Sequence, residues 1–185
     1  MRLDFVHTYQ MKFIFLSGFA GSGKDTVADQ LVSMGYVKYA FAQPIKESVA
    51  NTLSIPVEWC SDQDKKATYK TTSGMTLREY IIDVAERERK KDPEVWAKKI
   101  AQQIKYSTAK QVVFSDWRNL HELFCIQKTF PDAEIVCVRI KRSGQNISSV
   151  PDLTEYSLLG FPFQYTIDNI TGDYEYLEKQ IKSIA

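Results

Sequence analysis

The stretch KFIFLSGFAGSGKDT, residues 12 to 26, decides the fold class of this chain. Its first six residues predict a buried strand, and apolar residues at helical spacing follow the glycine-rich turn. The glycines permit a tight turn whose backbone N–H groups can face phosphate oxygens, and the lysine adds a mobile cation beside the N-terminus of a helix. The pattern predicts a phosphate-binding loop made of Gly18, Ala20, Gly21, Ser22, Gly23, Lys24, Asp25 and Thr26.

The loop departs from GxxxxGK[ST] because Asp25 stands at the hydroxyl position and Thr26 follows it. Thr26 is therefore the hydroxyl expected beside Mg²⁺. Asp25 has two open interpretations: a carboxylate stabilised by the helix dipole, or a group that positions Mg²⁺ or its waters. A dinucleotide site would need an acidic residue closing the second strand, and Val37 to Pro44 contains none. An ordinary glycine-rich turn with a surface lysine is the remaining alternative.

The composition is that of one globular domain, and we expect it to span residues 1–185. A net charge of +1 provides no bulk positive field for a nucleic-acid backbone, so duplex binding is not expected. No apolar run approaches the roughly 20 residues of a membrane span, and no secretion signal is apparent. The three cysteines, Cys60, Cys125 and Cys137, fit neither a zinc site nor a disulfide framework. A cytoplasmic protein is expected, and its oligomeric state is left open.

Strand and helix patterns alternate along the chain, with residues 1–10 as an N-terminal extension. This alternation predicts an α/β fold in which a central, mainly parallel five-stranded sheet is flanked by helices in three layers. Ligands in such folds bind at the carboxyl ends of the strands. The predicted strands are 12–17, 37–41, 111–115, 134–140 and 165–167; the predicted helices are 23–34, 44–53, 76–90, 92–106, 119–129 and 174–184; residues 61–73 and about 142–160 are predicted loops.

The third strand ends in Ser115-Asp116-Trp117-Arg118, which places an acid and a base at the edge where the phosphate loop lies. Asp116 is a candidate for holding Mg²⁺, directly or through water, and Arg118 for binding an acceptor phosphate as a bidentate fork. An N-cap and a solvated arginine are the structural alternatives. Trp117 either stacks on an acceptor base or packs in the core.

The segments quoted above, with Gln43-Pro-Ile-Lys-Glu47, Gly74-Met-Thr-Leu-Arg78-Glu and Ile167-Asp-Asn169, resemble the bacteriophage-type deoxynucleoside monophosphate kinases. The resemblance runs through nearly the whole chain from Met11. It implies an adenylate-kinase-like P-loop fold, a helical acceptor-binding region at about 44–106 and a lid-like loop at about 142–160. After Arg78 the chain departs from the family pattern, because the family's Gln and Gly-Thr-Glu or Gly-Thr-Asp are absent from residues 82–87.

The resemblance implies transfer of the ATP γ-phosphoryl group to a deoxynucleoside monophosphate, with Mg²⁺, in a cytoplasm that would be the host's for a phage protein. Lys24 and Thr26 would then serve the ATP phosphates and the metal, and Arg142 the lid over the donor. Asn169 could border the adenine or form an ordinary strand-to-helix turn. The expected catalytic residues are Lys24, Asp116, Arg118 and Arg142, and the expected acceptor-binding residues are Lys46, Arg78, Arg87, Trp117 and Arg118.

Two of these acceptor residues have plain alternatives: Lys46 as an exposed lysine, and Arg87, like Arg89, as part of a solvated helix face. Two other functions also stay open. One is a P-loop kinase acting on another small molecule, of the dephospho-coenzyme A or phosphomevalonate type. The other is a nucleotide-binding regulatory protein without transfer activity. Small-molecule nucleotides are the expected partners in the first interpretation, with neither nucleic acid nor membrane.

Overall fold

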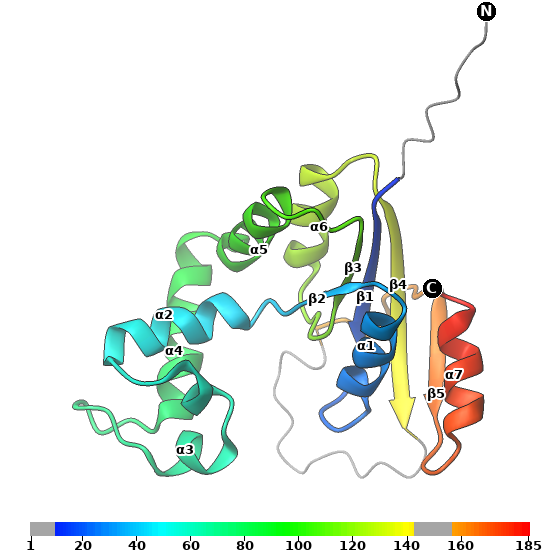
Figure 1. Ribbon diagram of the computed structural model, residues 1–185. Coiled ribbons are helices and arrows are strands. Elements are labelled where there is room, and N and C mark those ends of the chain that lie inside the picture. The colour runs from blue at the N-terminus through cyan, green and yellow to red at the C-terminus, as the bar shows by residue number, and fades with distance from the viewer. Residues whose placement is uncertain (1–9, 143–156) are drawn as a thin grey trace, which may run out of the picture.

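A five-stranded parallel sheet forms the centre of the computed structural model, which describes residues 10–142 and 157–185 (Figure 1). The strand order is β2-β3-β1-β4-β5, and every pairing between neighbours is parallel. The strands are β1 (Lys12–Ser17), β2 (Val37–Tyr39), β3 (Gln111–Phe114), β4 (Glu134–Arg142) and β5 (Tyr165–Asn169). The predicted α/β fold with a parallel sheet is confirmed.

The helices connect the strands as the sequence pattern predicts, with two differences. They are α1 (Lys24–Ser33), α2 (Gln43–Leu53), the 3₁₀ turn η1 (Val57–Cys60), α3 (Gln63–Thr68), α4 (Leu77–Lys91), α5 (Val95–Lys105), α6 (Leu120–Thr129) and α7 (Tyr174–Lys182). The prediction of a loop over 61–73 is wrong for α3, which Asp62 caps by accepting the N–H of Lys65 at 2.8 Å. The helix predicted over 92–106 begins later, as α5 at Val95, and the Asp92 carboxylate accepts the N–H of Glu94 in the turn before it.

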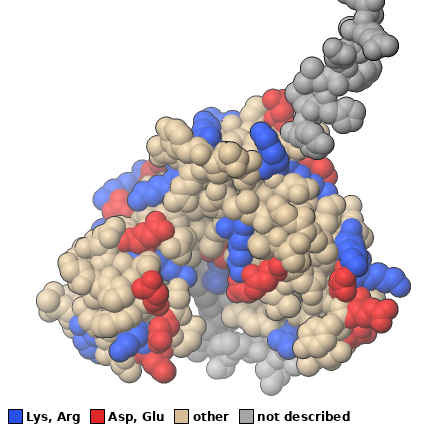
Figure 2. All heavy atoms as spheres, in the orientation of Figure 1, with Lys and Arg blue, Asp and Glu red and all other residues tan. Residues whose placement is uncertain are grey.

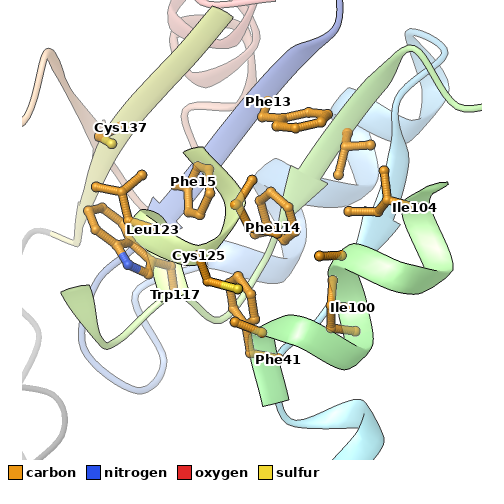
Figure 3. Packing of buried hydrophobic residues seen from close by; sticks show 14 of the residues in the cluster. Phe13, Phe15, Phe41, Ile100, Ile104, Phe114, Trp117, Leu123, Cys125 and Cys137 are labelled. Carbon is orange, nitrogen blue, oxygen red and sulfur yellow. The ribbon is translucent and has the colours of Figure 1, made fainter. Parts of the chain in front are cut away.

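Two hydrophobic cores cover the two faces of the sheet. On one face α5 and α6 pack over Phe13, Phe15 and Phe114, and Figure 3 shows these rings between the sheet and Ile100 and Ile104 of α5. On the other face α1 and α7 cover Ile14 and Leu16 of β1. Since β1 is buried on both faces, its last residues hold the glycine-rich loop on a rigid base.

A third core lies beside the sheet and belongs to α2, η1 and α4, which stand apart from the strands in Figure 1. Ile45 and Val49 of α2 pack there with Leu77 and Val84 of α4, and Trp96 of α5 joins them. Thr76 and Glu79 start α4 with a reciprocal capping box. These helices occupy the segment predicted as the acceptor-binding region at about 44–106.

Two predicted features lie wholly or largely outside the described residues: the N-terminal extension at 1–10 and most of the lid-like loop at about 142–160. Arg142, at the end of β4, is described. On the face shown in Figure 2, lysine and arginine side chains are interspersed with acidic ones. Within residues 10–142 and 157–185, no helix combines the length and the apolar character that a membrane crossing requires.

Candidate functional site

The glycine-rich loop joins β1 to α1 and closes on itself. The N–H of Ser22 donates to the carbonyl of Phe19 at 3.1 Å. Lys24 lies over the loop, and its Nζ donates to the carbonyl oxygens of Gly18 at 2.6 Å and Phe19 at 2.9 Å. The ammonium group is therefore placed at the loop that the sequence assigns to phosphate oxygens.

Gly23 is required by the backbone of this loop and by the space around it. Its φ of 96° lies in the left-handed region, and a Cβ there would stand 2.1 Å from Nδ2 of Asn169. Asn169, at the end of β5, donates from that Nδ2 to the carbonyl of Ser22 at 2.9 Å and is 9% exposed. The structure thus directs the Asn169 amide to the loop backbone, rather than to the place of an adenine ring that its sequence position suggested.

Arg142 is brought to the rim of the same loop. Its Nη1 donates to the carbonyl of Gly21 at 3.2 Å, and its Nε donates to the hydroxyl of Thr171 at 3.3 Å. This places the expected lid arginine next to the phosphate-binding loop.

Asp25 and Thr26 are exposed in the first turn of α1. The Asp25 carboxylate pairs with Lys38 of β2 at 2.9 Å, and the same ammonium contacts Asp29 at 3.0 Å. Both carboxylates raise the pKa of Lys38 against the opposing effect of burial. The contacts of Asp25 agree with its structural interpretation, a surface carboxylate in the first helical turn.

Asp116 joins the end of β3 to the start of α2. Its Oδ1 accepts the N–H of Phe41 at 2.7 Å, and its Oδ2 accepts the N–H of Ala42 at 2.9 Å. Burial raises the pKa of this carboxyl, although the two backbone N–H groups and the nearby Arg118 oppose the rise. Asp116 therefore holds together two walls of the neighbouring cavity, a role the sequence did not reveal.

A cavity of about 300 Å³ lies between α4, the start of α2 and the turn after β3. Three of the predicted acceptor residues line it: Lys46, Arg78 and Arg118. Nζ of Lys46 donates to Ser61 at 3.1 Å, and Nη2 of Arg78 donates to Gln63 at 2.8 Å. The structure brings these cations together although they come from three separate segments.

Two other predicted acceptor residues do not line this cavity. Trp117 is 1% exposed and packs edge-on against Phe15, Phe161 and Phe163, so its ring is core and cannot stack on a base. Arg87 is exposed and pairs with Asp83 at 3.3 Å. Trp117 is therefore a core residue, and Arg87 is part of a solvated helix face.

Three cavity residues were missed from the sequence. Lys66 comes from α3, and burial together with Arg78 and Lys46 lowers its pKa. Arg89 lines the cavity one helical turn beyond Ala85. Glu122 is 4% exposed, and burial next to Asp116 raises its pKa to about 7. The spacing of Asn119 and Glu122 as a capping box was the one available signal for the acid.

The fit of Mg²⁺ can be tested on the oxygen groups near the loop. Mg²⁺ is usually held by one or two carboxylates or hydroxyls together with substrate phosphates and waters. Thr26 offers an exposed hydroxyl, whereas both oxygens of Asp116 already accept backbone hydrogen bonds. In the described parts of the chain no group of three or more histidine, cysteine or acidic side chains could hold a metal ion. The exposed Thr26 hydroxyl thus fits an ion that is held mainly by substrate phosphates and waters.

A glycine-rich loop between the central strand and the first helix, facing a cationic cavity across the carboxyl end of a parallel sheet, defines a P-loop kinase. A crystal structure of TT1252 from Thermus thermophilus shares this fold, with a TM-score of 0.54 and 16% identity over 95% of this chain and 96% of that one. A shikimate kinase from Bacteroides thetaiotaomicron superimposes with a TM-score of 0.46 at 14% identity, covering 94% of this chain and 96% of its own.

Residues 12–91, a little under half of the chain, match the sequence model of the deoxynucleotide monophosphate kinase family. A search of curated proteins found no match. The matched segment contains the phosphate-binding loop and the helices α2 to α4 with the cavity residues Lys46, Lys66 and Arg78. The predicted resemblance to this family is confirmed for residues 12–91, and the chain is an ATP-dependent nucleotide kinase.

Proposed function

We propose that this kinase transfers the γ-phosphoryl group of ATP to the phosphate of a deoxynucleoside monophosphate, and that the cavity beside α4 holds the acceptor. The main support for this proposal is that five cationic side chains line the cavity: Lys46, Lys66, Arg78, Arg89 and Arg118. Burial, and then the neighbouring cations Arg78 and Lys46, lower the pKa of Lys66, so an anion placed among these cations would relieve their mutual repulsion. A phosphate monoester supplies such an anion.

In the proposed reaction, an oxygen of the acceptor phosphate forms a bond to the γ-phosphorus, and the bond from that phosphorus to the β–γ bridging oxygen breaks. ADP leaves and a deoxynucleoside diphosphate remains. The acceptor oxygen is already anionic, so no general base is needed. Catalysis then rests on cations that position and stabilise the transferring group.

Each cation has a place in this scheme. Lys24 binds donor phosphate oxygens at the loop, and Arg142 lies beside Gly21, where it can close over the donor. Arg118 follows the strand next to β1 and lines the cavity, which supports a role for it between the donor phosphates and the acceptor phosphate in this scheme. Asp116 and Asn169 bind no substrate in this scheme but hold the cavity walls and the loop.

Mg²⁺, when bound with ATP, would neutralise charge on the β- and γ-phosphates. We propose that the Thr26 hydroxyl holds it and that Asp116 approaches it only through water. Asp25, with its ion pair to Lys38, is left outside the metal's ligands.

The setting of the reaction is also a proposal. All three cysteines are free and buried, which fits the reducing cytoplasm that we propose, a host's in the case of a phage protein. We likewise propose that residues 1–185 form one kinase domain whose partners are small-molecule nucleotides.

The test is to incubate the protein with ATP, Mg²⁺ and each deoxynucleoside and ribonucleoside monophosphate in turn, and to separate the products. Formation of ADP and a matching diphosphate is expected with at least one deoxynucleotide. Lys24→Ala should lower turnover by about 10²-fold or more, because it removes charge stabilisation at the transferring group. Lys110→Ala, an exposed lysine before the opposite end of β3, is the matched control and should retain activity. ATP binding without product from any acceptor would refute the proposal.

A further inference from the structure

Helix α4 carries two arginines whose surroundings differ, Arg87 and Arg89. Arg87 is exposed, with its guanidinium occupied by Asp83 at 3.3 Å and Glu88 at 3.7 Å. Arg89 lines the acceptor cavity with a side chain that is 29% exposed. Residues at positions i and i+2 of a helix are about 200° apart around its axis, because each residue turns the helix by about 100°. The two side chains therefore provide one cation on the outer surface and one in the cavity.

Among the described residues, Arg89 forms one ion pair, with the buried Glu122 of α6. Nη2 of Arg89 lies 3.9 Å from Oε1 of Glu122, which is an ion pair but too long for a hydrogen bond. Within residues 10–142 and 157–185, Arg89 makes no hydrogen bond. A guanidinium has five N–H donors in a fixed fork, so those of Arg89 are available to a bound molecule.

Glu122 is itself fixed from several sides. Its Oε2 accepts the backbone N–H groups of Arg118 and Asn119, both at 3.1 Å, and its Oε1 accepts Nδ2 of Asn119 at 3.2 Å. The same carboxylate thus holds the backbone that carries Arg118 and attracts the guanidinium of Arg89. One buried acid orients two cations of the cavity.

We propose that Arg89 binds the acceptor nucleotide and that Glu122 is a positioning residue that keeps Arg89 and Arg118 directed into the cavity. This inference rests on the proposed function, since it concerns the same acceptor. The chemistry that Arg89 recognises is a pair of oxygen or nitrogen acceptors, which either the phosphate or a carbonyl-bearing base edge can supply. The sequence pattern gave no reason to separate Arg89 from Arg87.

The test compares Arg89→Met with its matched control Arg87→Met. Calorimetry without ATP gives the dissociation constant of each of the four deoxynucleoside monophosphates, and steady-state kinetics gives the KM of acceptor and of ATP. Arg89→Met should weaken acceptor binding by about 10-fold or more, the value of a hydrogen bond to a charged group, and leave the KM of ATP unchanged. Arg87→Met should change neither. A loss equal for all four acceptors assigns Arg89 to the phosphate, and a loss confined to some bases assigns it to the base edge.

Glu122→Gln tests the positioning role, because the amide oxygen can still accept both backbone N–H groups. It should raise the acceptor KM several-fold while kcat and the KM of ATP stay near wild type. In the Arg89→Met background the same change should add little, since part of its effect passes through Arg89. Undiminished acceptor binding by Arg89→Met, or full additivity of the two changes, would overturn the inference while the kinase activity stood. If the wild-type protein neither bound nor phosphorylated a monophosphate, the proposed function itself would fall.

Discussion

Replacing Gly23 with alanine should weaken ATP binding, because two costs fall on the same loop. A φ of 96° costs a residue with a Cβ about 1–2 kcal/mol. The new Cβ would stand 2.1 Å from Nδ2 of Asn169, so that amide must move and give up its hydrogen bond to Ser22, worth about 0.5–1.5 kcal/mol. The sum of about 1.5–3.5 kcal/mol corresponds to about 10- to 300-fold weaker ATP binding if the whole cost falls on the binding geometry.

Urea unfolding and calorimetric titration with ATP measure the two consequences of Gly23→Ala separately. Gly35→Ala is the matched control, because Gly35 has a φ of 100° but the nearest atom to its Cβ, Oε1 of Gln111, is 3.7 Å away. The control should lose about 1–2 kcal/mol of stability and keep its ATP affinity. In an Asn169→Ala background, Gly23→Ala should cost only the backbone term. If Gly23→Ala bound ATP as well as Gly35→Ala does, ATP binding would not depend on the glycine at position 23.

The remaining predictions concern the core and the cavity. Trp117→Ala should lower the free energy of unfolding by about 3–5 kcal/mol, measured in urea. Trp117→Phe should leave the order of preference among the four deoxynucleotide acceptors unchanged. A changed order would indicate that the Trp117 ring contacts the acceptor. The pKa of Glu122 is raised to about 7 in the folded protein, so the folded state binds more protons than the unfolded one above pH 4.5, and stability should fall as the pH rises from 5 to 8. Glu122→Gln should remove about 1–3 kcal/mol of that decline in urea titrations at the two pH values, and an identical pH dependence in both proteins would contradict the raised pKa. Lys66→Met should raise the acceptor KM about 10-fold with little change in the KM of ATP, and equal changes in both would count against a place in the acceptor cavity.

The sequence predicts the sheet well because its signals are local. KFIFLS forms β1 as predicted, and the run of branched residues in Glu134–Arg142 forms β4, two residues longer than predicted. Helix α3 was missed because its six residues, QDKKAT, carry no apolar period from which a buried face could be read. For the same reason the sequence did not identify Lys66, which lies on α3, as a residue of the cavity.

The candidate site likewise has a part that local sequence predicts and a part that only the fold brings together. The loop residues Gly18 to Thr26 follow from spacing, because adjacent residues in the chain make up the loop. The acceptor cavity depends on which face of α4 turns inward, and the polar run ERERKK does not specify that face. The run therefore does not distinguish Arg87, which is exposed, from Arg89, which lines the cavity. Likewise, no local pattern distinguishes a tryptophan buried among Phe15, Phe161 and Phe163 from one that faces a base.

The separate core of α2, η1 and α4 has a consequence for how the enzyme could change. The segment leaves the sheet after β2 and returns to it at β3, which is the strand paired with β2. Because the two strands are parallel, the segment leaves at the carboxyl end of β2, and the chain returns through α5 to the amino end of β3. The two strands are paired with each other, so the donor half can keep this pairing whatever lies between them. Such an arrangement suits exchange of the whole segment for another of different size, so that selection could retune the choice of acceptor while ATP handling is inherited intact.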